Sequence, residues 1–345
     1  MLRLSVLDQS PVPAGSTPSH ALQNSITLAR HVDSLGYHRF WMSEHHSMDT
    51  LACTAPEILL ARIGAETSRI RIGSGGIMLP HYTALKVAET FATLEALYPN
   101  RVDLGIGRAP GGGPIEATAL RRYRDAPRNA LHIDDFPDQL AELIAFFHHG
   151  FPHDHPFSRI TVAPHSPGTP ALWLLGSSLW SARAAAEFGL PYTFAHFFAG
   201  EGTRQAIELY HSHFRPNPAL GPDHRTAPEA MAAVGVICAD TQHEADHLAL
   251  SVRLLQYRIR QNDRRPIATP EDAALDLSNY PPLSPDPTEF PRYFVGTPDT
   301  LRPQLLAMTA KLNISELVVN TITHSPAARL RSYTLLAEAF KLPAP

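Results

Sequence analysis

Three ionisable residues, Glu44, His45 and His46, directly follow the short, mainly apolar segment 40–43. An imidazole at such a position moves protons near neutral pH, and a carboxylate beside it can fix its tautomer. A helical zinc site would instead need His residues four positions apart with Glu between them, whereas adjacent His residues on a strand point in different directions. The segment therefore predicts acid–base catalysis by at least one of these two His residues, with the Glu44 carboxylate beside them to fix a tautomer, and no metal. A structural or surface role is the alternative.

A second apolar segment, residues 103–107, ends at Arg108. A guanidinium at the end of a strand is suited to bidentate contact with a phosphate. An ion pair at the rim of the fold would explain the same residue. The segment also contains a Gly-x-Gly pair, but Pro110 occupies the place of the third glycine of a dinucleotide-binding fingerprint.

Small polar residues join a predicted strand to a predicted helix at Ser177, Ser178 and Ser181. The first N–H groups of a helix, with hydroxyl groups beside them, bind an anion. The same residues fit a helix N-cap, so the loop by itself does not decide between the two. Paired with Arg108 across the end of a barrel, this loop would form half of a phosphate site.

Two adjacent glycines, Gly75 and Gly76, lie inside the predicted strand 70–79. Glycine in the interior of a strand lowers stability, and it usually marks a bulge or a place where something approaches the backbone closely. Beside a phosphate site, these two residues would let a flat ring lie against bare backbone.

Strand and helix patterns alternate along the chain, which predicts βα units around a parallel sheet. The predicted strands are residues 2–8, 38–43, 70–79, 101–107, 171–175, 191–195, 230–239 and 314–320. The predicted helices are residues 17–35, 56–67, 84–97, 136–148, 178–188, 201–214, 242–258, 298–312 and 327–340. Insertions rich in Pro, Gly or polar residues occupy 109–135, 150–170 and 262–294.

This order predicts an α/β protein with a (β/α)8 TIM barrel, insertions after strands 4 and 7, and a single domain over residues 1–345. A doubly wound sheet would be expected to carry a glycine fingerprint at its first strand–helix turn, and none is there. In a parallel barrel the carboxyl ends of the strands meet at one mouth. The barrel would therefore bring the candidate residues together.

The composition excludes several classes of partner. The 345 residues are 44% hydrophobic and 18% charged, with a formal net charge of -4, so nothing favours nucleic acid or an anionic membrane as partner. Neither a signal peptide nor a membrane span is visible, and Cys53 and Cys238 are far apart. We expect a cytoplasmic protein with reduced thiols that acts on a small-molecule substrate.

The segments together resemble the bacterial luciferase-like family of flavin-dependent monooxygenases, in particular its single-chain, non-luminescent members. The resemblance rests on residues 41–46, 73–80, 101–110, 176–181 and 189–191, which occur in the right order at the predicted strand ends. It implies that His45 is the catalytic histidine beside the flavin, with Glu44 as its orienting partner. It also implies that Gly75-Gly76 forms a non-proline cis peptide under the isoalloxazine. The FMN-binding groups that the resemblance implies are the side chains of Arg108, Ser178 and Ser181 and the backbone at Ala109 and Ser177.

The resemblance also implies the reaction. Reduced FMN, supplied by a separate flavin reductase, would react with O2 through a C4a-peroxyflavin and oxygenate an organic substrate. The reactive cysteine of the light-emitting members falls at Gly107, which puts luminescence and a long-chain aldehyde substrate in doubt. The Ala-, Arg- and Pro-rich composition suggests secondary-metabolite tailoring, for example of polyketides in antibiotic biosynthesis. A homodimer through the helices after strands two and three is expected by analogy with the family. The alternatives are a deazaflavin (F420)-dependent hydride-transfer oxidoreductase and a non-catalytic flavin-binding protein.

Overall fold

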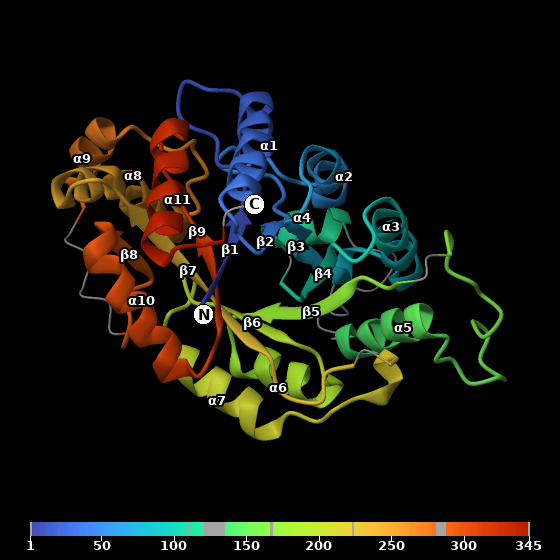
Figure 1. The fold of residues 1–345 in the computed structure, drawn as a ribbon. Coiled ribbons are helices and arrows are strands. Elements are labelled where there is room, and N and C mark those ends of the chain that lie inside the picture. Colours follow the sequence, from blue (N-terminus) through green and yellow to red (C-terminus); the bar gives the residue numbers. More distant parts are fainter. Residues whose placement is uncertain are drawn as a thin grey trace.

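Parallel strands form a barrel with helices around its outside (Figure 1). The computed structural model describes residues 2–109, 111–120, 135–165, 168–222, 224–280 and 288–343. The strands are β1 (Arg3–Asp8), β2 (Arg39–Met42), β3 (Arg71–Met78), β4 (Val102–Gly107), β5 (Ala171–Gly176), β6 (Tyr192–Ala195), β7 (Ala230–Cys238), β8 (Tyr293–Gly296) and β9 (Glu316–Asn320).

The helices follow the strands along the chain. They are α1 (Pro18–Ser34), α2 (Pro56–Glu66), α3 (Ala84–Leu97), α4 (Pro114–Leu120), α5 (Phe136–His148), α6 (Leu179–Phe188), α7 (Thr203–His213), α8 (Gln242–Arg260), α9 (Pro270–Leu277), α10 (Pro298–Leu312) and α11 (Pro326–Phe340), with 3-10 helices η1 (Leu79–His81) and η3 (Pro218–Leu220). Among the described residues, no helix combines the length and the apolar character that crossing a membrane requires.

Eight of the strands close the barrel, and every pairing is parallel. β1 pairs with β2 and with β9, the pairing continues from β2 to β7 in chain order, and β7 pairs with β9. The predicted α/β fold, a (β/α)8 barrel, is therefore confirmed. Because all strands run the same way, their carboxyl ends and the loops that follow them surround one opening, which we call the barrel mouth.

Three elements differ from the sequence-based expectation. β8 pairs with the second half of β7, from Gly235 to Cys238, and lies outside the eight-stranded ring. The helix α9 lies inside the stretch 262–294, and α4 lies inside 109–135, both of which were predicted as insertions with no helix assigned to them. Proline in the interior of a helix usually breaks or kinks it. Pro270, however, lies in the first turn of α9, where proline is tolerated because its missing N–H would be unpaired anyway.

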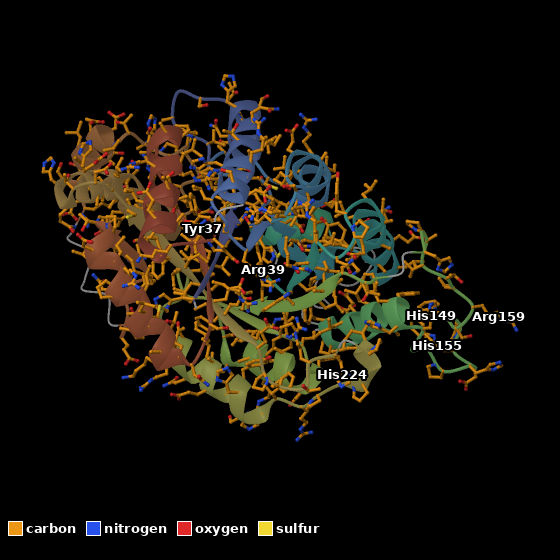
Figure 2. The ribbon with its side chains drawn as sticks, in the orientation of Figure 1. Tyr37, Arg39, His149, His155, Arg159 and His224 are labelled. Atoms are coloured by element: carbon orange, nitrogen blue, oxygen red, sulfur yellow. The ribbon has the colours of Figure 1, made fainter. Side chains whose placement is uncertain are left out.

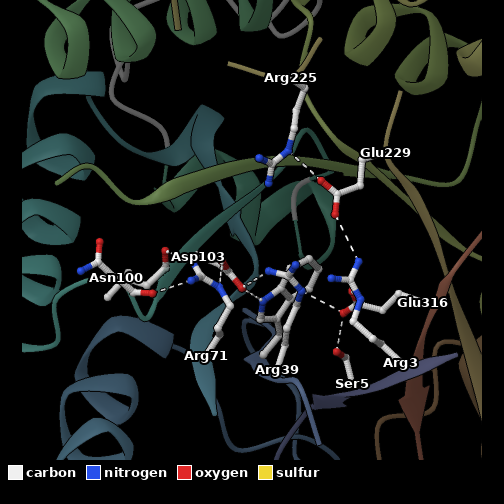
Figure 3. Close-up of polar contacts among 11 residues, drawn as sticks. Arg3, Ser5, Arg39, Arg71, Asn100, Asp103, Arg225, Glu229 and Glu316 are labelled. Atoms are coloured by element: carbon white, nitrogen blue, oxygen red, sulfur yellow. Dashed lines mark hydrogen bonds and ion pairs between the residues drawn. The ribbon is translucent and has the colours of Figure 1, made fainter. Parts of the chain in front are cut away.

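Charged side chains close the end of the barrel opposite the mouth (Figure 3). Arg39 donates to Asp103 at 2.8 Å and to Glu316 at 2.8 Å, and Arg71 donates to Asp103 at 2.7 Å. Burial alone would raise the pKa of the Asp103 carboxyl, but the two guanidinium groups hold it below its ordinary value. Arg39, Arg71 and Glu316 begin their strands and Asp103 is the second residue of β4, so the network links the amino ends of these strands.

An apolar layer fills the barrel between this network and the mouth. It consists of Leu7, Trp41, Trp173, Met231, Ala233 and Val318, against which Leu175 and Phe197 pack. The indole N–H of Trp41 donates to Asp103 at 3.0 Å, so this ring is held from below. The layer forms a dry floor under the mouth.

Residues 150–165 extend away from the barrel beside α5 (Figure 1) and contain only turns and bends, as predicted. Figure 2 places His155 and Arg159 on this extension and His149 at its base, remote from Arg39 in the barrel. His149 and His155, two of the 19 His residues of the sequence, therefore lie far from the mouth (Figure 2).

Candidate active site

The candidate residues come from four adjacent strands. β3 lies between β2 and β4, and β5 pairs with the other side of β4. Glu44 and His45 follow β2, Arg108 follows β4, and Ser177 follows β5. The barrel thus places these residues side by side at the mouth, with Gly75 and Gly76 on the strand between them.

Glu44 is fully buried and accepts hydrogen bonds from three donors. The hydroxyl of Tyr82 and Nε2 of His46 contact Oε1 at 2.8 and 2.7 Å, and the backbone N–H of Met78 contacts Oε2 at 2.9 Å. Burial, followed by the charge of Glu44, raises the pKa of Tyr82, so this hydroxyl remains a donor. Glu44 therefore ties the loop after β2 to the turn that follows β3.

His45 is half-buried, and its ring does not contact Glu44 through any hydrogen bond in the structure. Its Nδ1 lies 3.1 Å from Oγ of Ser43, and its backbone N–H donates to the carbonyl of Cys53 at 3.0 Å. Burial, and then the neighbouring His46, lower the pKa of His45 to about 4. The imidazole is therefore neutral at physiological pH and can accept or share a proton.

The predicted glycine irregularity is present in β3. Ser74 pairs with Leu104 and Ile77 with Ile106, so Gly75 and Gly76 stand opposite a single residue of β4 in a bulge, and the bond between them is cis. A Cβ on Gly75 would lie 2.6 Å from the Leu7 side chain, and one on Gly76 would lie 2.7 Å from the Gly105 carbonyl oxygen. Protein atoms fill both Cβ positions, so the backbone itself must form any contact surface here.

Arg108 meets the first turn of α6. Its guanidinium carbon lies 3.9 Å from the centre of the Trp180 ring, in a cation–π arrangement. Both Arg108 and Ala109 are exposed. The contact fixes the end of β4 against the start of the helix that follows β5, which is where a phosphate was predicted to bind.

The two serines of this turn form a capping box. Oγ of Ser178 accepts from the N–H of Ser181 at 3.3 Å, and Oγ of Ser181 donates to the Ser178 carbonyl at 2.7 Å and lies 3.0 Å from the Tyr192 hydroxyl. Ser178 is exposed, whereas Ser181 is buried. The sequence alone does not decide between a helix cap and an anion site. The structure shows the helix cap, and of the two serines it is Ser178 whose side chain also reaches solvent. Contact of either serine with a phosphate stays a prediction.

Three contact residues were missed by sequence reasoning: Ser43, Tyr82 and Trp180. Alternation along an extended chain pairs residues two apart, which would have assigned Ser43 to His45 and Glu44 to His46. No local signal indicates Tyr82 or Trp180. His196, which follows β6, is buried and contacts Thr203 at 2.8 Å and the Pro291 carbonyl at 3.1 Å.

The residues of this site provide two kinds of contact, one for an anionic group and one for a planar ring. A guanidinium next to the N–H groups of a helix start fits a phosphate. The bare backbone of Gly75 and Gly76 and the neutral His45 lie on the neighbouring strands, where a planar ring could reach them. In the described part of the chain, no three His, Cys, Asp or Glu side chains gather as a set of metal ligands.

Comparison with known proteins gives a consistent result. The sequence matches the family described as luciferase-like monooxygenase over residues 2–339. An N-acetyl-S-alkylcysteine monooxygenase of Bacillus subtilis (strain 168) is 33% identical over 98% of this chain and 98% of its own.

The solved structures that are similar to this chain include the following two. Apo-MsnO8 is 46% identical over 100% of this chain and 99% of its own, with a TM-score of 0.89. The oxygenating constituent of 3,6-diketocamphane monooxygenase from Pseudomonas putida, in complex with FMN, covers 100% of both chains with a TM-score of 0.71. Its sequence is only 20% identical, so this second likeness concerns the fold alone.

Proposed function

The chain belongs to the luciferase-like monooxygenase family, and on that premise we propose that it uses reduced FMN and O2 to oxygenate a small organic substrate. Membership makes it an oxygenating, flavin-dependent enzyme. The choice of FMN over deazaflavin F420, and the residues that hold it, are our proposal.

One observation carries the proposal: Arg108 stacks on Trp180 at the start of α6, while His45 follows β2, two strands away. A ligand whose anionic group binds beside Arg108 and whose ring extends toward His45 would lie across β3 at Gly75 and Gly76. FMN has a terminal phosphate at one end and a planar ring system at the other. The order of chemical groups along the mouth matches the order of groups in this cofactor.

Each residue then has a distinct task. Arg108 and the first turn of α6, with the backbone at Ala109 and Ser177 and the hydroxyl of Ser178, bind the phosphate. His45 is neutral, so it can hold or pass a proton at Nε2 while Ser43 occupies Nδ1. Glu44 positions the loop through Met78 and Tyr82 and does not act on His45 directly. The bound flavin, when reduced, supplies the electrons for O2 activation.

We further propose a flavin reductase as electron donor and a homodimer through α2 and α3. No nicotinamide-binding fingerprint is present in the sequence, which supports a separate reductase. The exposed side chains of Ile58 on α2 and Leu97 on α3 support an apolar interface there. Tailoring of a secondary metabolite is proposed from the Ala-, Arg- and Pro-rich composition.

The proposal is tested by incubating the protein with a flavin reductase, NADH, FMN and 18O2, and analysing a broad panel of substrates by mass spectrometry. Compounds that accumulate when the gene is deleted would extend the panel. We expect one 18O atom in the product, and His45→Ala should retain flavin binding while losing most of the product. Turnover unchanged by His45→Ala removes His45 from the mechanism, and reduction of substrate by F420 without 18O incorporation refutes the monooxygenase.

A further inference from the structure

Arg264, outside the predicted site, joins two loops of the barrel mouth. It lies between α8 and α9. Its Nη1 donates to the carbonyl oxygen of Ser47 at 2.6 Å and to Oε1 of Glu116 at 2.8 Å. Ser47 belongs to the loop after β2, two residues beyond His45, and Glu116 lies in the first turn of α4, after β4. One guanidinium therefore connects the loops that follow the two strands flanking β3.

A run of three glycines fills the space between this ion pair and the backbone beside His45. The N–H of His46 donates to the carbonyl of Gly111 at 2.9 Å. A Cβ on Gly112 would lie 3.3 Å from the His46 carbonyl oxygen, and one on Gly113 would lie 2.6 Å from Oε2 of Glu116. The three glycines therefore pack against the loop of His45 on one side and against the side chain of Glu116 on the other.

The backbone that carries Arg264 is itself anchored at the mouth. The hydroxyl of Thr50 contacts the carbonyls of Arg264 and Arg265 at 2.7 and 3.0 Å. Further along, the N–H of Ile267 donates to the carbonyl of Val12, in the loop after β1, at 2.8 Å. Arg264 thus extends from a fixed segment, and its side chain is only 24% exposed.

We propose that Arg264 is a positioning residue of the active site: it holds Ser47 and Glu116 together and thereby fixes Gly111–Gly113 against the backbone beside His45. It closes this side of the mouth against water. The consequence for turnover rests on the proposed function. When the Arg264 guanidinium is removed, O2 takes up the two electrons of the reduced flavin and two protons, and it leaves as H2O2 instead of oxygenating the substrate.

The geometry is tested first without flavin, by hydrogen–deuterium exchange of the whole chain. In Arg264→Met we expect the His46 amide to exchange about tenfold faster, the factor that corresponds to removing one charge-assisted hydrogen bond. Glu116→Gln, which leaves the Ser47 contact intact, should give a smaller increase and serves as the milder variant if Arg264→Met folds poorly.

Arg265→Met is the matched control. Arg265 is the next residue along the chain, and its side chain is 62% exposed. Its Nη2 pairs with Asp263 at 2.7 Å, outside the loops of the mouth. Its removal should leave the exchange of the His46 amide unchanged. Unaltered exchange in both Arg264→Met and Glu116→Gln, or an equal increase in Arg265→Met, overturns the proposal.

A second readout separates positioning from mere stability. With a reductase and a substrate that the wild-type protein oxygenates, Arg264→Met should raise the H2O2 formed per NADH several-fold, while Arg265→Met should not. Coupling equal to that of the wild type would contradict a positioning role. A wild-type protein that oxygenates nothing refutes the proposed function, whereas the exchange experiment still decides whether Arg264 holds the loop.

Discussion

Replacing Glu44 by Gln tests the contacts that we assign to the buried carboxylate. Oε1 receives the Tyr82 hydroxyl and His46 Nε2, and Oε2 receives the Met78 N–H. An amide placed with its NH2 toward Met78 would face a backbone donor that cannot reverse. Turned the other way, the NH2 faces a hydroxyl that can rotate and an imidazole that can change tautomer. The second orientation should therefore be adopted.

The expected cost follows from the change in hydrogen-bond strength. Bonds to a charged group contribute about 1.5–3 kcal/mol and neutral ones about 0.5–1.5 kcal/mol. Three bonds that each weaken by about 1 kcal/mol give a loss of roughly 3 kcal/mol, which relief from burying a charge partly offsets. We expect the free energy of unfolding to fall by about 2 kcal/mol.

Urea unfolding of the apoprotein, followed by tryptophan fluorescence, measures this free energy. Glu57→Gln is the matched control: Glu57 is half-buried, its Oε2 has no hydrogen-bond partner, and burial raises its pKa. It should change stability by less than about 0.5 kcal/mol. A loss below about 0.5 kcal/mol in Glu44→Gln, or equal losses in both variants, would refute the assignment of three productive contacts to Glu44.

Further predictions concern charge and space. Because the pKa of His45 is lowered to about 4, the unfolded chain protonates first as pH falls. The stabilisation from neutral His45 is complete above about pH 6.5 and is lost toward pH 4. If the free energies of unfolding of the wild type and of His45→Asn change with pH in the same way across this range, the predicted contribution of His45 is contradicted. Gly76→Ala, whose Cβ would meet a carbonyl oxygen at 2.7 Å, should lower the unfolding temperature far more than Gly107→Ala, whose nearest contact is at 3.4 Å; equal shifts would argue against the tight packing. Asp103→Asn removes the buried charge that pairs with Arg39 and Arg71, although Arg39 keeps Glu316, and it should cost about 3–5 kcal/mol in urea unfolding; a cost under about 1 kcal/mol would show that the network is dispensable.

The barrel and the location of its mouth were predictable because apolar strands stop at residues that cannot stay buried unpaired. Glu44 and Arg108 mark two such stops, and both lie where the pattern placed them. β8 was missed because it has only four residues, of which the last is Gly296, after a proline-rich stretch, and so short a segment shows no period that distinguishes it from a loop. The bulge at Gly75 and Gly76 was readable, since glycine in the interior of a strand often marks such an irregularity.

Contacts between distant segments were not predictable in the same way. The sequence suggested that Glu44 orients His45 because the two are adjacent, yet alternation turns adjacent side chains to opposite sides, and Glu44 meets His46. The Arg264–Glu116 contact joins residues 148 positions apart, and no local pattern indicates it. Such pairs follow from the closed sheet, which brings together loops that the chain separates.

Equilibrium titration of the apoprotein with FMN and with F420, in wild type and in Arg108→Met, tests the central claim most directly. The proposed function predicts that FMN binds in preference to F420, and the arrangement of Arg108, Trp180 and the start of α6 predicts that Arg108 contributes to FMN binding. It also predicts that Arg108→Met weakens FMN binding at least about tenfold, the effect of removing one charge-assisted hydrogen bond. Preference for F420 would contradict the proposed cofactor, and FMN binding unchanged by Arg108→Met would contradict the placement of the phosphate at this end of the mouth.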